Sequence, residues 1–374
     1  MRIGIDARLY HQTGVGRYIR NLIEELSQID IKNDYFVYLR RKEFNEFSPP
    51  NIRWHKRLAD IPWHTVKEQY AMPRVLLADK LDIAHFTYFN VPVLYPKKYI
   101  LTIHDLIVDH FDTGRASTLP MVLYKAKRLG YRFSIARGIK RAETIVAISE
   151  TTKQEIIDHY KVPSKRIRVT YDALDRSFAN TLRSHHPKKY YTFQYVLYVG
   201  NAYPHKNLER TLLAFKKIKR NKPDYKLVLA GDDKYFYPRL KDVAQKHGIG
   251  SDVVFFGEAN DEQLINLYTF SSCLVFPSLM EGFGLPTLEA LSCGKIPVIS
   301  DIPVFREIWG KDLPFFDPYH FEAIADRILG VLDMNSKLYR GIVTKASRRL
   351  SKYSWKKTAF QTRELYEYVF NGKV

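Results

Sequence analysis

The sequence predicts an α/β protein built from two Rossmann-like, doubly wound domains. Two observations support this fold class. Short apolar runs alternate with segments of helical periodicity, as in parallel sheets whose strands are joined by crossover helices. The same pattern stops at a polar stretch and then begins again. A chain of 374 residues is also long enough to bury two separate cores.

The first half of the chain supplies the first predicted domain. Parallel strands are expected at residues 2–6, 35–39, 83–86, 99–103 and 144–148. Residues 11–17 are expected to form a loop that leads into a helix, since apolar residues then recur at positions i, i+3, i+4 and i+7: Ile19, Leu22, Ile23 and Leu26. Ser149 is the predicted N-cap of the helix that follows the last of these strands.

A polar stretch at residues 180–189 is predicted to be the linker between domains. After it, strands are expected at residues 195–199, 226–230, 253–256, 272–276 and 296–300, with a helix over 208–218. We therefore predict domains at residues 1–183 and 184–354. Residues 355–374 are predicted to form a helix that packs back on the first domain.

Composition narrows the functional classes. Cys273 and Cys293 are too few for a disulfide framework, and the sequence starts directly on the first strand-like run with no signal-peptide pattern, so a cytoplasmic protein is expected. No segment has the roughly 18 consecutive apolar residues that a membrane-spanning helix needs, so any membrane contact is expected to be peripheral.

The chain carries a net charge of +19, from 59 basic and 40 acidic residues. The densest basic segment, residues 125–141, interleaves basic and apolar residues and is predicted to form one amphipathic helix; its basic members are Lys125, Lys127, Arg128, Arg132, Arg137, Lys140 and Arg141. Such a helix suits an anionic membrane surface at the inner face of a membrane, and a solvated helix face is the alternative. Nucleic acid is not expected as a partner, because no nucleic-acid-binding signature accompanies the charge.

Residues 281–289 form the most informative motif, Glu-Gly-Phe-Gly-Leu-Pro-Thr-Leu-Glu. Gly282 and Gly284 allow a ligand to approach the backbone closely, and Pro286 suits the first turn of a helix. The N-terminus of that helix would attract a diphosphate, while Glu281 and Glu289 could accept hydrogen bonds from sugar hydroxyls.

With the flanking residues 275–278 and 294–299, this motif resembles the donor-binding signature of the retaining glycosyltransferases of family 4. The resemblance covers nearly the whole chain, and residues 6–18 and 198–207 resemble mannosyltransferase-like members. It implies the B-type glycosyltransferase (GT-B) fold, in which two domains face each other across a cleft. The N-terminal domain would then bind the acceptor and the C-terminal domain the nucleotide sugar.

The resemblance also implies roles for residues of the second domain. Lys206 follows a strand and precedes a helix, where its ammonium group would clamp the diphosphate. Glu289 would bind the ribose hydroxyls, and Glu281 would face the transferred sugar. The remaining expected donor-binding residues are Gly200, Asn201, Gly282 and the backbone N–H groups of Phe283, Gly284 and Leu285. Asn201 stands where the family often has a second basic residue.

Three residues of the first domain complete the expected site. His104 ends a strand and matches a family histidine that lies close to the donor sugar. Gly14 and Gly16 would let the first loop approach the acceptor and the phosphates, although a simple tight turn is the alternative.

The resulting hypothesis is a retaining hexosyltransferase, in which His104, Lys206 and Glu281 carry the chemistry. Mannose from GDP-mannose would pass to a saccharide or lipid-linked acceptor in cell-surface polysaccharide assembly. Neither a metal nor another cofactor is expected, because the sequence lacks the usual metal motifs. The alternatives are a nucleotide-sugar epimerase of similar fold and a non-enzymatic membrane or nucleic-acid binder driven by charge.

Overall fold

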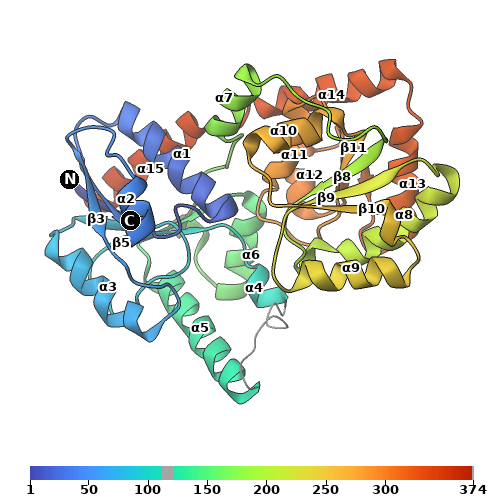
Figure 1. The fold of residues 1–374 in the computed structure, drawn as a ribbon. Helices are drawn as coiled ribbons and strands as arrows, with labels where there is room; N and C mark the ends of the chain where they lie inside the picture. Colours follow the sequence, from blue (N-terminus) through green and yellow to red (C-terminus); the bar gives the residue numbers. More distant parts are fainter. Residues whose placement is uncertain (112–120, 373–374) are drawn as a thin grey trace. The chain divides into compact units, whose positions relative to one another are not determined.

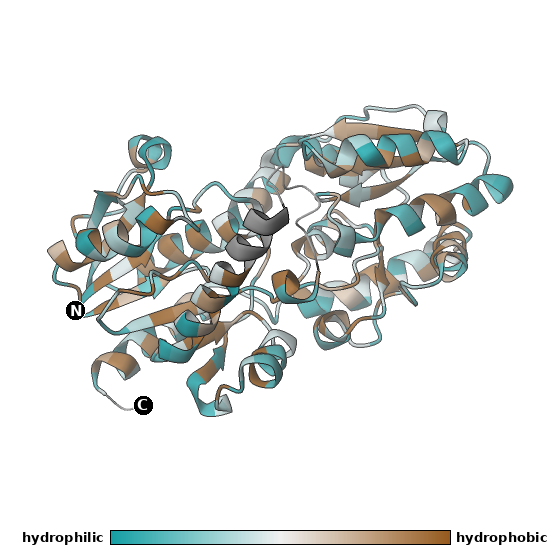
Figure 2. Cartoon of the chain, turned by 90° about the horizontal axis from the view of Figure 1, so that it is seen from below, coloured by the Kyte–Doolittle hydropathy of each residue, from teal (hydrophilic) through white to brown (hydrophobic). Residues whose placement is uncertain are grey.

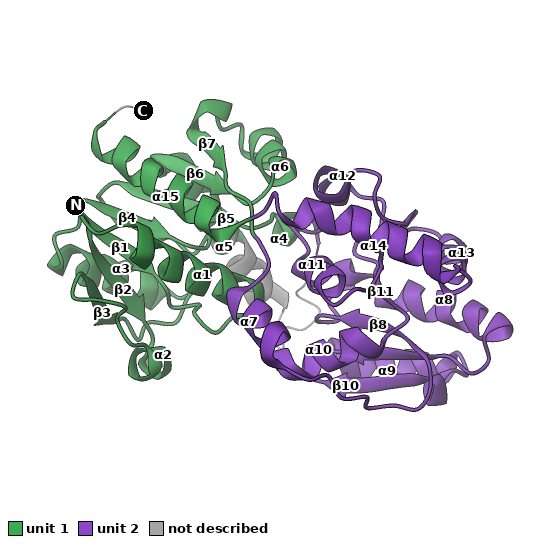
Figure 3. Cartoon of the chain, turned by 90° about the horizontal axis from the view of Figure 1, so that it is seen from above, with its two compact units in different colours: residues 1–109, 117–172, 354–374 green, residues 110–116, 173–353 purple. Residues whose placement is uncertain are grey.

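The computed structural model describes residues 1–111 and 121–372, and it describes side chains there except for residues 121–128 and 131. The chain forms two compact units (Figure 3). The first comprises residues 1–109, 117–172 and 354–374, and the second comprises residues 110–116 and 173–353. The division after residue 172 precedes the boundary that the sequence suggested, because residues 173–183 group with the second unit.

The first unit contains a fully parallel sheet in the order β3-β2-β1-β4-β5-β6-β7. Its strands are β1 (Arg2–Asp6), β2 (Asp34–Leu39), β3 (Trp54–Leu58), β4 (Ile83–Phe86), β5 (Tyr99–Ile103), β6 (Thr144–Ala147) and β7 (Ile167–Val169). The five predicted strands are confirmed. The prediction missed β3 and β7, which are the edge strands and are either polar or only three residues long, so that neither reads as an apolar run.

In the described residues, the helices that accompany this sheet are α1 (Thr13–Ile29), α2 (Arg41–Glu46), α3 (Val66–Ala78), α4 (Ile107–His110), α5 (Met121–Arg141), α6 (Glu150–Tyr160) and α15 (Trp355–Phe370) (Figure 1). Ser149 caps α6 as predicted, since its side chain accepts a hydrogen bond from the N–H of Thr152. The expected loop at residues 11–17 is wrong: α1 begins at Thr13, so both of its glycines lie in the first helical turn.

The C-terminal helix α15 packs on α1 and on the first sheet. Arg363 donates a hydrogen bond to the carbonyl of Ile29 at 3.2 Å, and the hydroxyl of Tyr366 lies 2.7 Å from Nδ1 of His85. Tyr366 is fully buried. Helix α15 is therefore part of the core of the first unit.

The second unit repeats the same architecture with a parallel sheet in the order β10-β9-β8-β11-β12-β13. Its strands are β8 (Tyr195–Val199), β9 (Lys226–Ala230), β10 (Val253–Gly257), β11 (Cys273–Phe276), β12 (Pro297–Ser300) and β13 (Phe315–Phe316). All five strands predicted for this half are confirmed. Only the two-residue edge strand β13 was not expected.

Helices cover both faces of the second sheet (Figure 1). One face carries α8 (Leu208–Asn221), α9 (Phe236–Lys246) and α13 (Phe321–Leu332). The remaining helices are α7 (Arg176–Ser184), α10 (Asp261–Phe270), α11 (Leu285–Ser292), α12 (Pro303–Trp309) and α14 (Ser336–Leu350). The predicted linker at residues 180–189 is wrong in its first half, because α7 continues to Ser184. Its N-cap Asp175 accepts a hydrogen bond from the N–H of Phe178, whose ring is buried.

The strand orders of both sheets reverse at one point. In the first sheet this point lies between β1 and β4, and in the second between β8 and β11. Each reversal leaves a crevice at the carboxyl ends of the two central strands, where α/β proteins bind ligands.

Figure 2 shows the hydropathy along these elements. Among the described residues, no helix is both long enough and apolar enough to cross a membrane.

Candidate functional site

The predicted donor-binding residues of the second unit lie around the strand-order reversal of its sheet, whereas Gly14 and Gly16 lie on α1 of the first unit. Lys206 ends the short 3-10 helix Pro204–Lys206, which follows β8, and Glu281 lies in the loop that follows β11. Since β8 and β11 are paired parallel neighbours, their carboxyl ends bring these two loops together. Residues 75 positions apart in the sequence thus become direct contacts.

Lys206 and Glu281 form an ion pair. Nζ of Lys206 lies 2.5 Å from Oε1 of Glu281, and the two side chains are only 13% and 10% exposed. The hydroxyl of Ser278 donates a second hydrogen bond to the same carboxylate oxygen at 2.6 Å. Nζ also lies 5.5 Å from the centre of the Phe276 ring. The ammonium group is therefore held in place, and its charge is balanced within the protein.

The turn after Glu281 brings the N-terminus of α11 to this pair. Gly284 is the N-cap with φ of 92°, and a Cβ atom at this position would lie 2.7 Å from Cε1 of Phe305. Only glycine meets both the backbone and the packing requirement. Leu285 and Pro286 are the first two residues of the helix. Backbone N–H groups and the positive end of the helix dipole are therefore available to an anion.

The two residues before Gly284 lie in the interior. Gly282 and Phe283 are both buried, and the Phe283 ring packs edge-on against Tyr353 with 5.4 Å between ring centres. The Phe283 side chain therefore anchors the turn, and only its backbone can serve a ligand.

Glu289 lies on α11 and is only 2% exposed. Oε2 of its carboxylate accepts a hydrogen bond from the hydroxyl of Tyr268 at 2.8 Å. Its predicted contact with a ribose stays a prediction, and the structure adds that Tyr268, from α10, orients the carboxylate.

The loop after β8 is shaped by close contact between glycines. Gly200 and Gly231 have φ of 143° and 146°, and a Cβ atom on Gly231 would lie 2.0 Å from the carbonyl oxygen of Gly200. That carbonyl accepts a hydrogen bond from the hydroxyl of Tyr237 at 2.7 Å. The carbonyl of Asn201 likewise accepts one from Tyr198 at 2.6 Å. Gly200 and Asn201 thus lie in a loop that is fixed by its own backbone.

His205 precedes Lys206 and is 4% exposed. Burial, together with the neighbouring Lys206 charge, lowers the pKa of His205 to about 3, so the imidazole is neutral at neutral pH. Its ring lies 5.8 Å from that of Phe111, and in the described part of the chain its buried Nδ1 has no hydrogen-bond partner.

His104 lies in the first unit, directly after β5. Nε2 of His104 lies 2.9 Å from the carbonyl oxygen of Thr87, and its ring packs edge-on against Tyr18. Burial lowers the pKa of His104 to about 4. A neutral imidazole that donates from Nε2 carries its lone pair on Nδ1, which can accept a hydrogen bond from a sugar hydroxyl.

The glycines of α1 differ in their surroundings. A Cβ atom on Gly16 would lie 2.5 Å from the carbonyl oxygen of Tyr10, so the first helical turn and residue 10 approach closely. Gly14 has no atom within 4 Å of an added Cβ, so packing does not require glycine there.

Several residues of the site were not recognised in the sequence. Ser278 stood in the quoted motif but had no assigned role, and Tyr268 has no local signal at all. Asn207 adopts a left-handed backbone with φ of 61°, and its side-chain amide donates hydrogen bonds to the carbonyls of Pro277 and Pro318. It therefore ties the loop after β8 to the loop after β11.

Among the described residues, no three His, Cys, Asp or Glu side chains form a group suited to a metal ion.

Two family models match consecutive parts of the chain. The model of glycosyltransferase family 4 matches residues 12–178, and the model of glycosyl transferases group 1 matches residues 183–354. The fold and the two models agree with the resemblance drawn from the motifs. The chain belongs to the glycosyltransferases of family 4.

Curated relatives and solved structures are consistent with this membership. The serotype-specific mannosyltransferase WbdA of Escherichia coli is 31% identical over 59% of this chain, but the match spans only 28% of that longer protein. The O-antigen chain mannosyltransferase B of Escherichia coli is 28% identical over 96% of this chain and 97% of its own. RfbU, the O-antigen chain mannosyltransferase of Salmonella typhimurium, is 25% identical over 82% and 83%.

The fold matches solved glycosyltransferases along their whole length. The sucrose-phosphate synthase of Thermosynechococcus elongatus superposes with a TM-score of 0.77 at 18% identity, and covers all of both chains. WaaG, a glycosyltransferase involved in lipopolysaccharide biosynthesis, gives a TM-score of 0.73 at 14% identity over 97% and 99% of the chains. The architecture is the GT-B fold.

Proposed function

We propose that this protein transfers a mannosyl residue from GDP-mannose to a saccharide or lipid-linked acceptor, with retention of configuration, in the assembly of a cell-surface polysaccharide such as an O-antigen. The observation that carries the proposal is the Lys206–Glu281 ion pair beside the N-terminus of α11, at the strand-order reversal of the second sheet. A cation and a helix N-terminus suit a diphosphate, and adjacent carboxylates suit sugar hydroxyls. The choice of mannose rests on the names of the two O-antigen relatives that match most of this chain.

The proposed reaction is a front-face substitution. The bond between the sugar C1 and the diphosphate oxygen breaks, the acceptor oxygen bonds to C1 from the same face, and the acceptor proton passes to the departing diphosphate. The protein contributes position and charge: Lys206 and the N–H groups of Gly284 and Leu285 would stabilise the negative charge that develops on the leaving group. No metal ion is required in this scheme.

Release of Lys206 from Glu281 is the step that the geometry adds. The carboxylate at 2.5 Å neutralises the ammonium group, so an incoming diphosphate must compete with Glu281 for it. Ser278 keeps its hydrogen bond to Glu281 during that exchange and holds the carboxylate in position for a sugar hydroxyl. Binding of the donor and orientation of Glu281 would thus be coupled.

The test is a thermal-shift comparison of GDP, UDP, ADP and their hexose conjugates, with wild type and Glu289→Gln side by side. Ligands that bind only the folded state raise its melting temperature. We expect GDP and GDP-mannose to give the largest shift and Glu289→Gln to reduce it, because the neutral amide has one acceptor oxygen in place of two and lacks the charge that would strengthen a hydrogen bond from a ribose hydroxyl. A larger shift with UDP or ADP would refute the choice of nucleotide, and no shift with any of them would refute the donor site.

We also propose that the enzyme works at the cytoplasmic face of a membrane, through α5. This helix is continuous, as predicted, but its apolar side chains are not confined to its buried face. Leu129 and Phe133 are 72% and 62% exposed, with the half-exposed Arg132 between them. The basic residues Lys125, Lys127 and Arg128 belong to the helix, but their side chains lie outside the described part. Sedimentation with vesicles containing anionic phospholipid should be weakened by Leu129→Ser/Phe133→Ser; unchanged sedimentation would refute the contact.

A further inference from the structure

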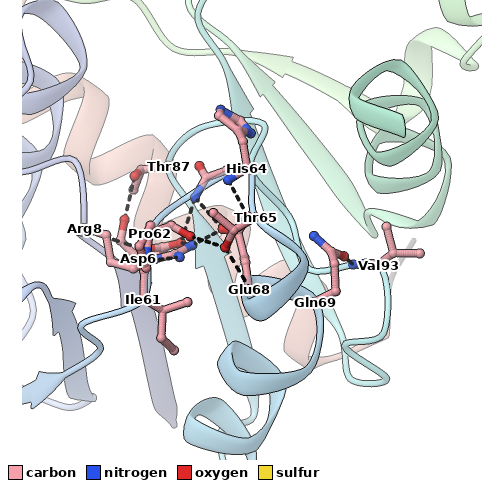
Figure 4. A network of polar contacts seen from close by, with 11 residues as sticks. Asp6, Arg8, Ile61, Pro62, His64, Thr65, Glu68, Gln69, Thr87 and Val93 are labelled. Atoms are coloured by element: carbon pink, nitrogen blue, oxygen red, sulfur yellow. Dashed lines mark hydrogen bonds and ion pairs between the residues drawn. The ribbon is translucent and has the colours of Figure 1, made fainter. Parts of the chain in front are cut away.

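The first unit has its own strand-order reversal, between β1 and β4, and a buried ion-pair network fills it (Figure 4). Arg8, just after β1, lies 2.6 Å from Oδ2 of Asp6 and 2.6 Å from Oε1 of Glu68 on α3. All three side chains are buried. Burial raises the pKa of Glu68. For Arg8, burial alone would lower the pKa, but the neighbouring carboxylates of Asp6 and Glu68 outweigh it, so the pKa of Arg8 is raised.

This network holds the loop that follows β4. The amide of Asn90 lies 3.3 Å from Glu68 and 3.4 Å from Asp6, and the hydroxyl of Thr87 donates to the carbonyl of Asp6 at 2.6 Å. The N–H of Val93 donates to the side chain of Gln69 at 2.7 Å (Figure 4). Residues 87–93 are thus held by four hydrogen bonds at three residues, and cannot rearrange without breaking the buried ones.

The fastened loop presents aromatic rings. Phe89 is buried, and its ring centre lies 3.8 Å from that of Tyr88 and 6.2 Å from that of His64, with interplanar angles of 32° and 29°. Tyr88 and His64 are both partly exposed. The Tyr88 ring also lies near the ring of His104, with 6.1 Å between the two ring centres. We call Tyr88, Phe89 and His64 the aromatic platform.

His64 has a left-handed backbone conformation, which helps to place its ring in this arrangement. Its φ is 58°, which is uncommon for a residue with a side chain. The N–H of His64 donates to Oε2 of Glu68 at 2.7 Å, so the carboxylate that binds Arg8 also fixes this conformation. In Figure 4 the imidazole extends away from the ion pairs.

We propose that the aromatic platform binds one pyranose ring of the acceptor, by stacking against its apolar C–H face, and that the Asp6–Arg8–Glu68 network is the positioning device beneath it. The inference rests on the proposed glycosyltransfer, since it assigns the acceptor side of that reaction. Three observations carry it: the platform lies at the strand-order reversal of its sheet, it adjoins His104, and buried charged groups hold it rigid.

The test separates acceptor binding from donor binding. The acceptor probes are p-nitrophenyl α-glycosides of mannose, glucose and galactose, assayed with the nucleotide sugar that stabilises the wild type most. Tyr88→Leu keeps apolar volume and removes the ring, Tyr88→Phe keeps the ring, and His64→Asn tolerates the left-handed backbone and removes the imidazole. Tyr70→Leu, at an exposed tyrosine on α3, is the matched control.

We expect Tyr88→Leu and His64→Asn to raise the acceptor KM roughly three- to tenfold, the range of an aromatic stacking contact, and to leave the donor KM unchanged. The loss of ring packing on Phe89 should lower the melting temperature only slightly. Tyr88→Phe and Tyr70→Leu should resemble wild type. An unchanged acceptor KM in both ring-deletion variants would overturn the platform. So would a lack of transfer to every probe by an enzyme that binds the donor. Failure of the wild type to bind any nucleotide sugar would instead overturn the proposed function itself.

Discussion

The Lys206–Glu281 ion pair can be tested by separating its structural role from its binding role. In Lys206→Met the ammonium group is lost and the side-chain volume is nearly kept. Among the described residues, Glu281, which is 10% exposed, then keeps the hydrogen bond from Ser278 alone. Leaving one member of a largely buried ion pair uncompensated costs about 3 kcal/mol of unfolding free energy. For a unit of this size that lowers the melting temperature by about 6–12 °C.

The double variant Lys206→Met/Glu281→Gln removes the uncompensated charge. We expect its stability to return to within about 1 kcal/mol of wild type, because the neutral amide keeps the hydrogen bond to Ser278 at little cost. Its affinity for a nucleoside diphosphate should not return. The loss of one charge-assisted hydrogen bond to phosphate, about 2 kcal/mol, corresponds to roughly thirtyfold weaker binding in both variants.

The assays are denaturant unfolding for stability and isothermal titration calorimetry with GDP for binding. Two results would refute the reasoning. If the double variant is as unstable as Lys206→Met, the ion pair does not balance a buried charge. If the double variant binds GDP as wild type does, Lys206 does not contact the diphosphate.

Three further predictions follow. Gly284→Ala should cost about 2–4 kcal/mol and abolish GDP binding, since the new methyl group meets Phe305 and φ of 92° is strained for alanine; a stable variant that binds GDP would contradict the turn's role. Burial raises the pKa of Asp172 from 3.8 to about 8, so the folded state holds a proton that the unfolded state releases, and this residue's destabilising effect grows as the pH rises from about 4 to about 8. Asp172→Asn should therefore unfold at a higher denaturant concentration than wild type at pH 8 and at the same concentration at pH 4; parallel pH profiles would contradict the buried, protonated carboxyl. Dialysis against EDTA should change the transfer rate by less than about twofold, and a loss restored by added Mn²⁺ or Mg²⁺ would contradict a metal-independent reaction.

The sequence predicted the central strands well because these strands are buried on both faces. A central strand of a parallel sheet must be apolar throughout, so β1, β4, β5, β8 and β9 read as short apolar runs. Edge strands such as β3 carry charged residues and gave no such signal. The helix boundary at Thr13 was missed because two glycines in the first turn read as a loop.

The candidate site likewise contains residues that the sequence suggested and residues that only the structure revealed. Lys206, Glu281 and Glu289 could be proposed from the sequence because they lie in contiguous motifs with glycines and a proline, whose backbone requirements are visible in sequence. The contacts of Tyr268 with Glu289 and of Arg8 with Glu68 could not, because these partners lie 21 and 60 positions apart and meet only when the elements that carry them pack together.

The sequence by itself determined the class of fold and the family, and it led to the proposed donor motif, since these depend on local periodicity and on contiguous motifs. Tertiary structure decided the rest. The parallel pairing of β8 with β11 brings Lys206 to Glu281, and the pairing of β1 with β4 brings Asp6 to the loop that holds Tyr88. Strand order is set by the packing of the whole sheet rather than by any local segment, so these contacts are fixed only when each unit is folded.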